Sequence, residues 1–167
     1  MNTAIDLISH LVGSVCVGLI AWRLFFFKKT KLLWFSLAAA ALGGILNDID
    51  HFIDYYFAFG LNFRFDYFFG GYEFLKSLKA YVFFHAYEYA IIFIIIAIVL
   101  KSRKWKFFFM VLAISLLLHI GIDLALTDLK WQTYSIAYRI EHNFNFKYFL
   151  SEKNYKKMLI EKAEKGM

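Results

Sequence analysis

LLWFSLAAAALGGILNDIDHFIDYYF, residues 32–57, is the stretch that decides the fold of this chain. It begins as an apolar run and ends in Asp48-Ile49-Asp50-His51, with Asp54 shortly after. The run is long enough for a transmembrane helix, which needs about 20 residues to cross roughly 30 Å of hydrocarbon. Carboxylates and an imidazole are costly at that depth, so the polar end of the stretch is a candidate functional site with partners on neighbouring helices.

The composition places the rest of the chain in a membrane as well. Hydrophobic residues make up 61% of the 167 residues and aromatic residues 22%, and the mean hydropathy is +0.55. These values are too apolar for a soluble domain of this size. We therefore expect an all-α, polytopic membrane protein, a bundle of four transmembrane helices near residues 5–27, 32–57, 80–100 and 105–127.

The remaining segments are expected at the membrane surface. Residues 57–74 are dense in Phe and Tyr and predict an aromatic loop in the interface. We expect one transmembrane domain, residues 1–127, followed by a basic amphipathic tail, residues 128–167. From Ser151 the tail predicts an amphipathic helix that either lies on the membrane or packs on the loops.

Charge and cysteine content exclude several classes of protein. The net charge of +6 comes from basic residues that flank apolar spans, where they meet anionic lipid head groups; nucleic acid is not an expected partner. Cys16 is the single cysteine, so neither an internal disulfide nor a Cys-based zinc motif can form. The sequence does not predict an oligomeric state.

Basic residues in two short turns predict the orientation. By the positive-inside rule both turns are cytoplasmic, and their members are Arg23, Lys28, Lys29 and Lys31, then Lys101, Arg103, Lys104 and Lys106. Polar residues on all four predicted helices lie about 24 to 27 Å from these turns, at 1.5 Å per residue. We therefore expect them to converge at one level near the extracytoplasmic face of a bacterial-type inner membrane.

Helical spacing groups the same polar residues in pairs. His119 and Asp123 are four residues apart and His85 and Glu88 three apart, so each pair shares a helix face. The pattern predicts a metal site whose candidate ligands are His10, Asp48, Asp50, His51, His85, His119 and Asp123. Among these, His10 and Asp48 would complete a second metal or support the other ligands. Nitrogen and oxygen ligands favour Zn²⁺, with Mn²⁺ or Fe²⁺ as alternatives.

These motifs resemble the YdjM-like predicted inner-membrane metal-dependent hydrolases. Members carry a His in the first span, an Asp-x-Asp-His segment closing the second, a further His, and a late His-x-x-x-Asp. The matching residues here are His10, Asp48-Ile49-Asp50-His51, His85 and His119-Ile120-Gly121-Ile122-Asp123, and Asn47 stands where the family often has proline. The resemblance covers most of residues 7–127 and implies a metal site and a hydrolytic reaction.

A site of this kind at head-group level suggests the chemistry. A metal held by imidazoles and carboxylates activates water, and we expect Glu88, or secondly Asp54, to accept the proton as general base. The expected substrate is a membrane lipid or a lipid-linked ester or phosphoester.

Other functions and a simpler interpretation stay open. A di-metal lipid oxidase or hydroxylase could use the same residues, although the Glu-x-x-His pairs typical of di-iron bundles are missing. An ion or proton-relay subunit of a transport system is the third possibility. Alternatively, the polar groups are hydrogen-bonded packing residues without a ligand.

Overall fold

The computed structural model describes residues 3–26 and 31–167. These residues form nine α-helices and three short 3-10 helices without a strand, which confirms the all-α class. The chain divides into two compact units. The bundle unit contains Asn2–Asn47 and Ala86–Ala125, and the loop unit contains Asp48–His85 and Leu126–Met167. The residues after 127 therefore pack with the middle of the chain.

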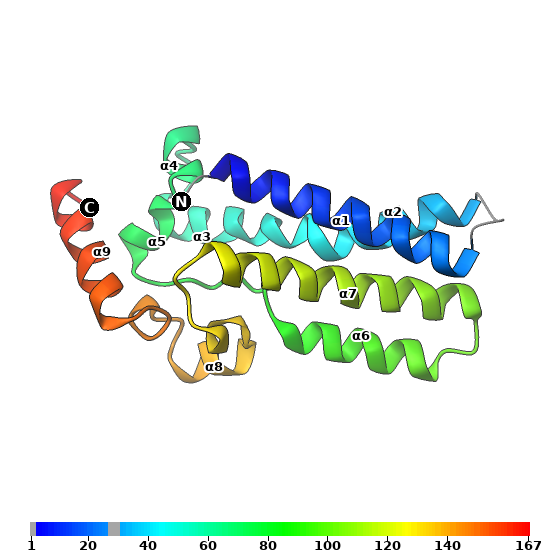
Figure 1. Cartoon of the computed structure of the whole chain (residues 1–167). Coiled ribbons are helices and arrows are strands. Elements are labelled where there is room, and N and C mark those ends of the chain that lie inside the picture. Colours follow the sequence, from blue (N-terminus) through cyan, green and yellow to red (C-terminus); the bar gives the residue numbers. More distant parts are fainter. Residues whose placement is uncertain (1–2, 27–30) are drawn as a thin grey trace. The chain divides into compact units, whose positions relative to one another are not determined.

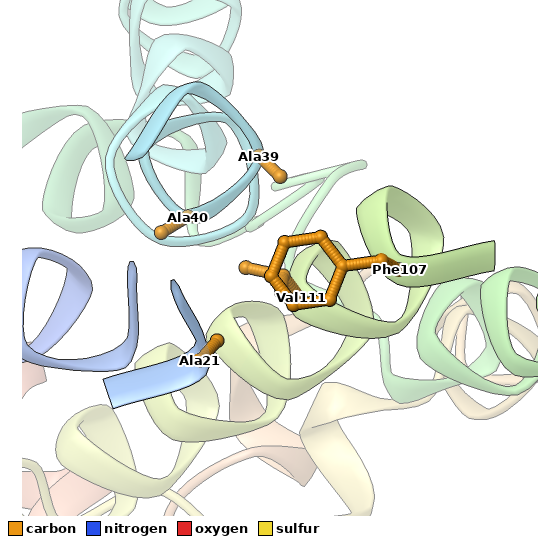
Figure 2. Packing of buried hydrophobic residues seen from close by; sticks show 5 residues of the cluster. All are labelled: Ala21, Ala39, Ala40, Phe107 and Val111. Carbon is orange, nitrogen blue, oxygen red and sulfur yellow. The ribbon is translucent and has the colours of Figure 1, made fainter. Parts of the chain in front are cut away.

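The bundle unit consists of helices that lie alongside one another (Figure 1). They are α1 (Thr3–Phe26), α2 (Lys31–Gly44), α6 (Tyr87–Val99) and α7 (Arg103–Leu126). Figure 2 shows the buried core, in which three alanines of α1 and α2 face two larger side chains of α7. The core residues are Ala21, Ala39, Ala40, Phe107 and Val111.

Small residues let these helices approach closely. A methyl group added at Gly43 of α2 would overlap the backbone carbonyl of Leu112 on α7. At Gly18 the Ser36 hydroxyl donates a hydrogen bond of 2.7 Å across to the α1 carbonyl. Helices in membranes pack through such small-residue contacts because lipid provides no hydrophobic drive for association.

Two of the described helices are long and apolar enough to cross a membrane. They are Ile8–Phe25 within α1 and Arg103–Leu126, and a third span is possible if Leu32–Gly44 and Asn47–Phe59 form one broken span. The span predicted at residues 80–100 is shorter than expected. Its helix, α6, begins only at Tyr87 and has 13 residues, about 20 Å of helix. The basic turn expected at Lys28 and Lys29 lies outside the described residues.

The loop unit contains short helices joined by irregular segments. They are α3 (Asp50–Phe59), α4 (Phe65–Phe69), α5 (Tyr72–Ser77), η2 (Trp131–Tyr134), α8 (Ile136–Glu141), η3 (Phe146–Tyr148) and α9 (Glu152–Glu164). A further turn, η1 (Leu46–Ile49), leads into α3. The Ser151 hydroxyl caps α9 by accepting from the Asn154 amide, as expected for a helix start.

Helix α9 packs on the loops of its own unit. Lys162 Nζ donates to the Lys76 carbonyl at 2.7 Å, and Lys165 Nζ donates to the Tyr72 hydroxyl at 2.8 Å. Both acceptors belong to α5. Of the two placements that the sequence left open for this helix, the structure therefore has the packed one.

Aromatic side chains surround α3 and α4, as the composition of this region predicts. Phe52 and Phe68 stack with ring centroids 4.4 Å apart. Leu61 and Phe65 remain largely exposed, at 91% and 71%. An exposed aromatic and aliphatic surface of this kind is typical of residues that contact lipid at head-group depth.

Candidate metal centres

Three of the predicted ligands meet in the bundle unit, contributed by α1 and α7. His10 Nε2 lies 3.0 Å from Asp123 Oδ1, and His119 Nε2 lies 3.5 Å from Asp123 Oδ2. The two imidazole rings stack with centroids 3.9 Å apart. All three residues are buried, and their ligand atoms lie within 4.8 Å of one another, close enough to hold one metal ion.

The contact of the other ring nitrogen of His119 determines which nitrogen carries the proton. Nδ1 lies 2.9 Å from the Gly44 carbonyl oxygen, which can only accept, so Nδ1 carries the proton. A neutral imidazole has a single N–H, and its Nε2 therefore presents a lone pair to the Asp123 carboxylate. Two facing acceptors need a further proton or a metal ion between them.

A second set of predicted ligands meets in the loop unit. His85 Nδ1 lies 3.1 Å from Asp50 Oδ2, and His85 Nε2 lies 3.3 Å from Asp48 Oδ1. The His51 ring stands edge-on to the His85 ring at 5.2 Å. Asp50, His51 and His85 each offer a ligand atom within 4.8 Å of the other two.

Like His119, His85 has an oxygen acceptor next to each of its ring nitrogens. Its two nitrogens both face carboxylate oxygens, although a neutral ring has one proton to donate. Asp50 is 0% exposed, and its Oδ1 has no hydrogen-bond partner among the described residues. Its Oδ2 also accepts from the Phe84 amide at 2.6 Å. A buried carboxylate is stable when it is paired or coordinates a cation, so this cluster also suits a metal ion.

The segment that presents His85 is not helical, and two charged side chains, Asp54 and Arg139, form hydrogen bonds with its backbone. Asp54 accepts from the backbone amides of Tyr81 and Val82, both at 2.8 Å. Arg139 of α8, 0% exposed, donates to the carbonyls of Tyr81, Val82 and His85 at 3.1, 2.6 and 3.0 Å. These bonds occupy backbone groups that a helix would use, which explains why α6 starts only after His85.

This segment also stores backbone strain. Val82 has a φ of +32°, a conformation that a β-branched residue rarely adopts. Such strain persists only where surrounding contacts over-determine the backbone, and it clusters at functional sites. The bonds from Asp54 and Arg139 provide those contacts on both sides of Val82.

Predicted site residues thus meet within each of the two units. His10, His119 and Asp123 meet in the bundle unit, and Asp48, Asp50, His51 and His85 meet in the loop unit. The expected convergence of all the helices at one level remains a prediction. Of the two candidate bases, Asp54 already accepts a backbone hydrogen bond at each oxygen, and Glu88 lies partly buried in the first turn of α6.

Sequence reasoning missed two charged residues of the loop unit. Glu73 of α5 is 1% exposed, and its Oε1 lies 3.8 Å from His51 Nδ1. An acid between apolar neighbours in the aromatic loop was the available signal for it. No such signal existed for Arg139, because a basic residue in a lysine-rich tail is expected to be exposed to solvent.

Searches of family models, curated proteins and solved structures with this chain find no match.

Proposed function

We propose that the protein is a membrane-embedded metal-dependent hydrolase that acts on a lipid or lipid-linked ester or phosphoester. The observation that carries this proposal is the pair of histidines, His85 and His119, whose two ring nitrogens each face an oxygen acceptor. A divalent cation between imidazole and carboxylate resolves that conflict with ordinary coordination chemistry. The resemblance of these motifs to the YdjM-like hydrolases supports the same conclusion.

The ligand set favours particular metals. Imidazole nitrogens and carboxylate oxygens suit Zn²⁺, and also Mn²⁺ or Fe²⁺. Asp48, Asp50, His51 and His85 would hold an ion in the loop unit, and His10, His119 and Asp123 would hold one in the bundle unit. Such an ion, when bound, supplies Lewis acidity and an acidified water for hydrolysis.

The surroundings of the loop-unit cluster favour a lipid substrate. Exposed Leu61, Phe63 and Phe65 follow directly on α3, which carries Asp50 and His51. Aromatic and aliphatic side chains of this kind enter the head-group region of a bilayer. The basic residues of α9, in the same unit, would add attraction for anionic head groups.

Proton transfer requires a carboxylate that can accept a proton from the metal-bound water. Asp54 is held by two backbone amides, and Glu88 follows the ligand His85 by three residues, so we assign Glu88 as the first candidate for the general base. A base near neutral pH contributes roughly 10²- to 10⁴-fold to the rate, so Glu88→Gln should lower kcat by about that factor while bound metal is retained.

The first experiment measures metal in the purified protein. Wild type, Asp50→Ala and His119→Ala are purified in detergent, and bound metals are quantified by inductively coupled plasma mass spectrometry. Glu152→Gln, which alters an exposed acid of α9, is the matched control. We expect zinc or manganese in wild type and the control, and a loss in each alanine variant that still folds.

Activity is then assayed on mixed micelles that contain ester-linked and phosphoester-linked lipids. Metal-dependent release of a head group or acyl chain is the expected result. Protein that stays free of metal after incubation with Zn²⁺, Mn²⁺ and Fe²⁺ would refute the hydrolase.

The same contacts support a second candidate function, a proton relay. A second proton on His85 or His119 satisfies the facing acceptors as a metal does, and buried acid–histidine pairs are the elements of intramembrane proton paths. Proton flux into liposomes by metal-free protein, abolished in Asp50→Asn, would favour the relay over the hydrolase.

A further inference from the structure

Glu73 is a buried carboxylate in a segment that the sequence assigns to an interfacial loop. It lies in the first turn of α5, between Gly71 and Leu78, which both have positive φ. With 1% of its surface exposed, it is as buried as a core residue. Charged residues are almost never buried to this extent unless they are paired.

Among the described residues, the Glu73 carboxylate faces a partner at one oxygen only. Oε1 lies 3.8 Å from His51 Nδ1, and buried Oε2 has no hydrogen-bond partner among the described residues. A buried carboxylate oxygen without a hydrogen-bond partner lowers the free energy of unfolding, because the water that solvated it has been removed. A side chain kept at such a cost points to a ligand-dependent role.

Helix α5 holds the His51 ring on two sides through consecutive residues. Glu73 faces the Nδ1 edge, and the Phe74 ring packs edge-on against the imidazole with centroids 5.5 Å apart. Phe74 in turn stacks on Phe146 at 5.5 Å. The orientation of His51 is therefore determined by α5 as well as by its own helix, α3.

The position of Glu73 at Nδ1 determines which nitrogen of His51 is available to a cation. The negative charge of the Glu73 carboxylate, 3.8 Å from Nδ1, favours the imidazole proton on Nδ1 and the lone pair on Nε2. Metal-binding histidines usually donate their second N–H to a carboxylate or carbonyl, which fixes the tautomer and makes the ligand nitrogen more basic. His51 belongs to the cluster with Asp50 and His85.

We propose that Glu73 is the carboxylate that positions His51 for metal binding in the loop unit. This inference rests on the metal site of the proposed function and adds a residue that none of the sequence motifs includes. Glu73 acts through His51 and does not bind the metal itself. It also links the aromatic segment, through α5, to the cluster where the cation binds.

The charge of the cluster agrees with this role. With neutral histidines, Asp48, Asp50 and Glu73 carry three negative charges within contact of the two imidazoles. A divalent cation would offset most of that charge. Removing the Glu73 charge should therefore weaken metal binding while relieving the metal-free protein of a buried charge.

The test compares the affinity for Co²⁺ across a double-mutant cycle of Glu73→Gln, His51→Ala and the double variant, with Glu152→Gln as the matched control. The full chain is used in detergent, and affinity is measured by competition with a chelator. We expect Glu73→Gln to bind Co²⁺ about 10- to 100-fold more weakly. Because Glu73 acts through His51, the double variant should bind no more weakly than His51→Ala alone.

Two further measurements separate positioning from other roles. The visible absorption spectrum of bound Co²⁺ should be unchanged in Glu73→Gln and altered in His51→Ala, because only the latter changes a ligand. Metal-free Glu73→Gln should melt at the same or a higher temperature than metal-free wild type.

Each contrary result has a definite meaning. An unchanged affinity in Glu73→Gln, additive losses in the double variant, an altered Co²⁺ spectrum, or failure of Glu73→Gln to fold would overturn the positioning role while leaving the metal site intact. Wild type that binds no Co²⁺ would overturn both the positioning role and the proposed function.

Discussion

Arg139 shows how much a single buried side chain can organise. Its guanidinium donates three hydrogen bonds to the segment that presents His85. Replacement by Met would leave three carbonyls without these donors. We expect Arg139→Met to lower the free energy of unfolding by about 3 kcal/mol, a drop of roughly 6 to 12 °C in melting temperature for a chain of this size.

The matched control is Arg64→Met. Arg64 is paired with Asp66 at 2.7 Å, but both side chains are more than half exposed, and such surface pairs contribute about 0 to 1 kcal/mol. Thermal melts in the same detergent compare the two variants. Equal shifts would contradict the structural role of Arg139, and an intact Co²⁺ affinity in Arg139→Met would show that the cluster does not depend on this segment.

At the scale of elements, the packing of α2 on α7 depends on one glycine. An added methyl group at Gly43 meets the Leu112 carbonyl, which belongs to rigid helix backbone. We expect Gly43→Ala to cost about 1 to 3 kcal/mol, the range for overpacking. Thermal unfolding in detergent provides the measurement.

Gly121 of α7 supplies the matched comparison for this substitution. A methyl group added there meets nothing within 4 Å, and alanine is the better helix former by roughly 0.5 to 1 kcal/mol. Gly121→Ala should therefore be neutral or stabilising. A loss of stability in both variants would indicate that the helix itself, rather than the contact between α2 and α7, is sensitive to the change.

At the scale of the whole molecule, metal binding should stabilise the fold. A ligand at 100 times its dissociation constant adds about 2.7 kcal/mol to the free energy of unfolding. We expect Zn²⁺ to raise the melting temperature of wild type, EDTA to reverse the rise, and Asp50→Asn and His119→Asn each to reduce it. An identical rise in both variants would place the metal elsewhere.

Membrane insertion is a second property of the whole chain. With two helices long and apolar enough to span a bilayer, the protein should stay in the membrane pellet after extraction with alkaline carbonate, which releases peripheral proteins. Recovery in the supernatant would show that the apolar helices cover one another instead of contacting lipid.

The sequence by itself predicted the helical class and the residues that gather into clusters. An apolar run of about 20 residues that crosses a membrane is restricted to few structures, because its backbone N–H and C=O groups must form hydrogen bonds within the segment. Spacings of three and four residues follow directly from helix geometry, so the pairing of His119 with Asp123 needed no tertiary information.

Only the tertiary structure determined where α6 begins and that Glu73 is buried. The start of α6 depends on Asp54 and Arg139, which bind backbone groups 27 to 58 residues away in sequence. No local pattern encodes a bond over that separation. The burial of Glu73 beside His51 also depends on tertiary contacts. Hydropathy describes the composition of a segment, and it does not identify the side chain that packing against other segments buries.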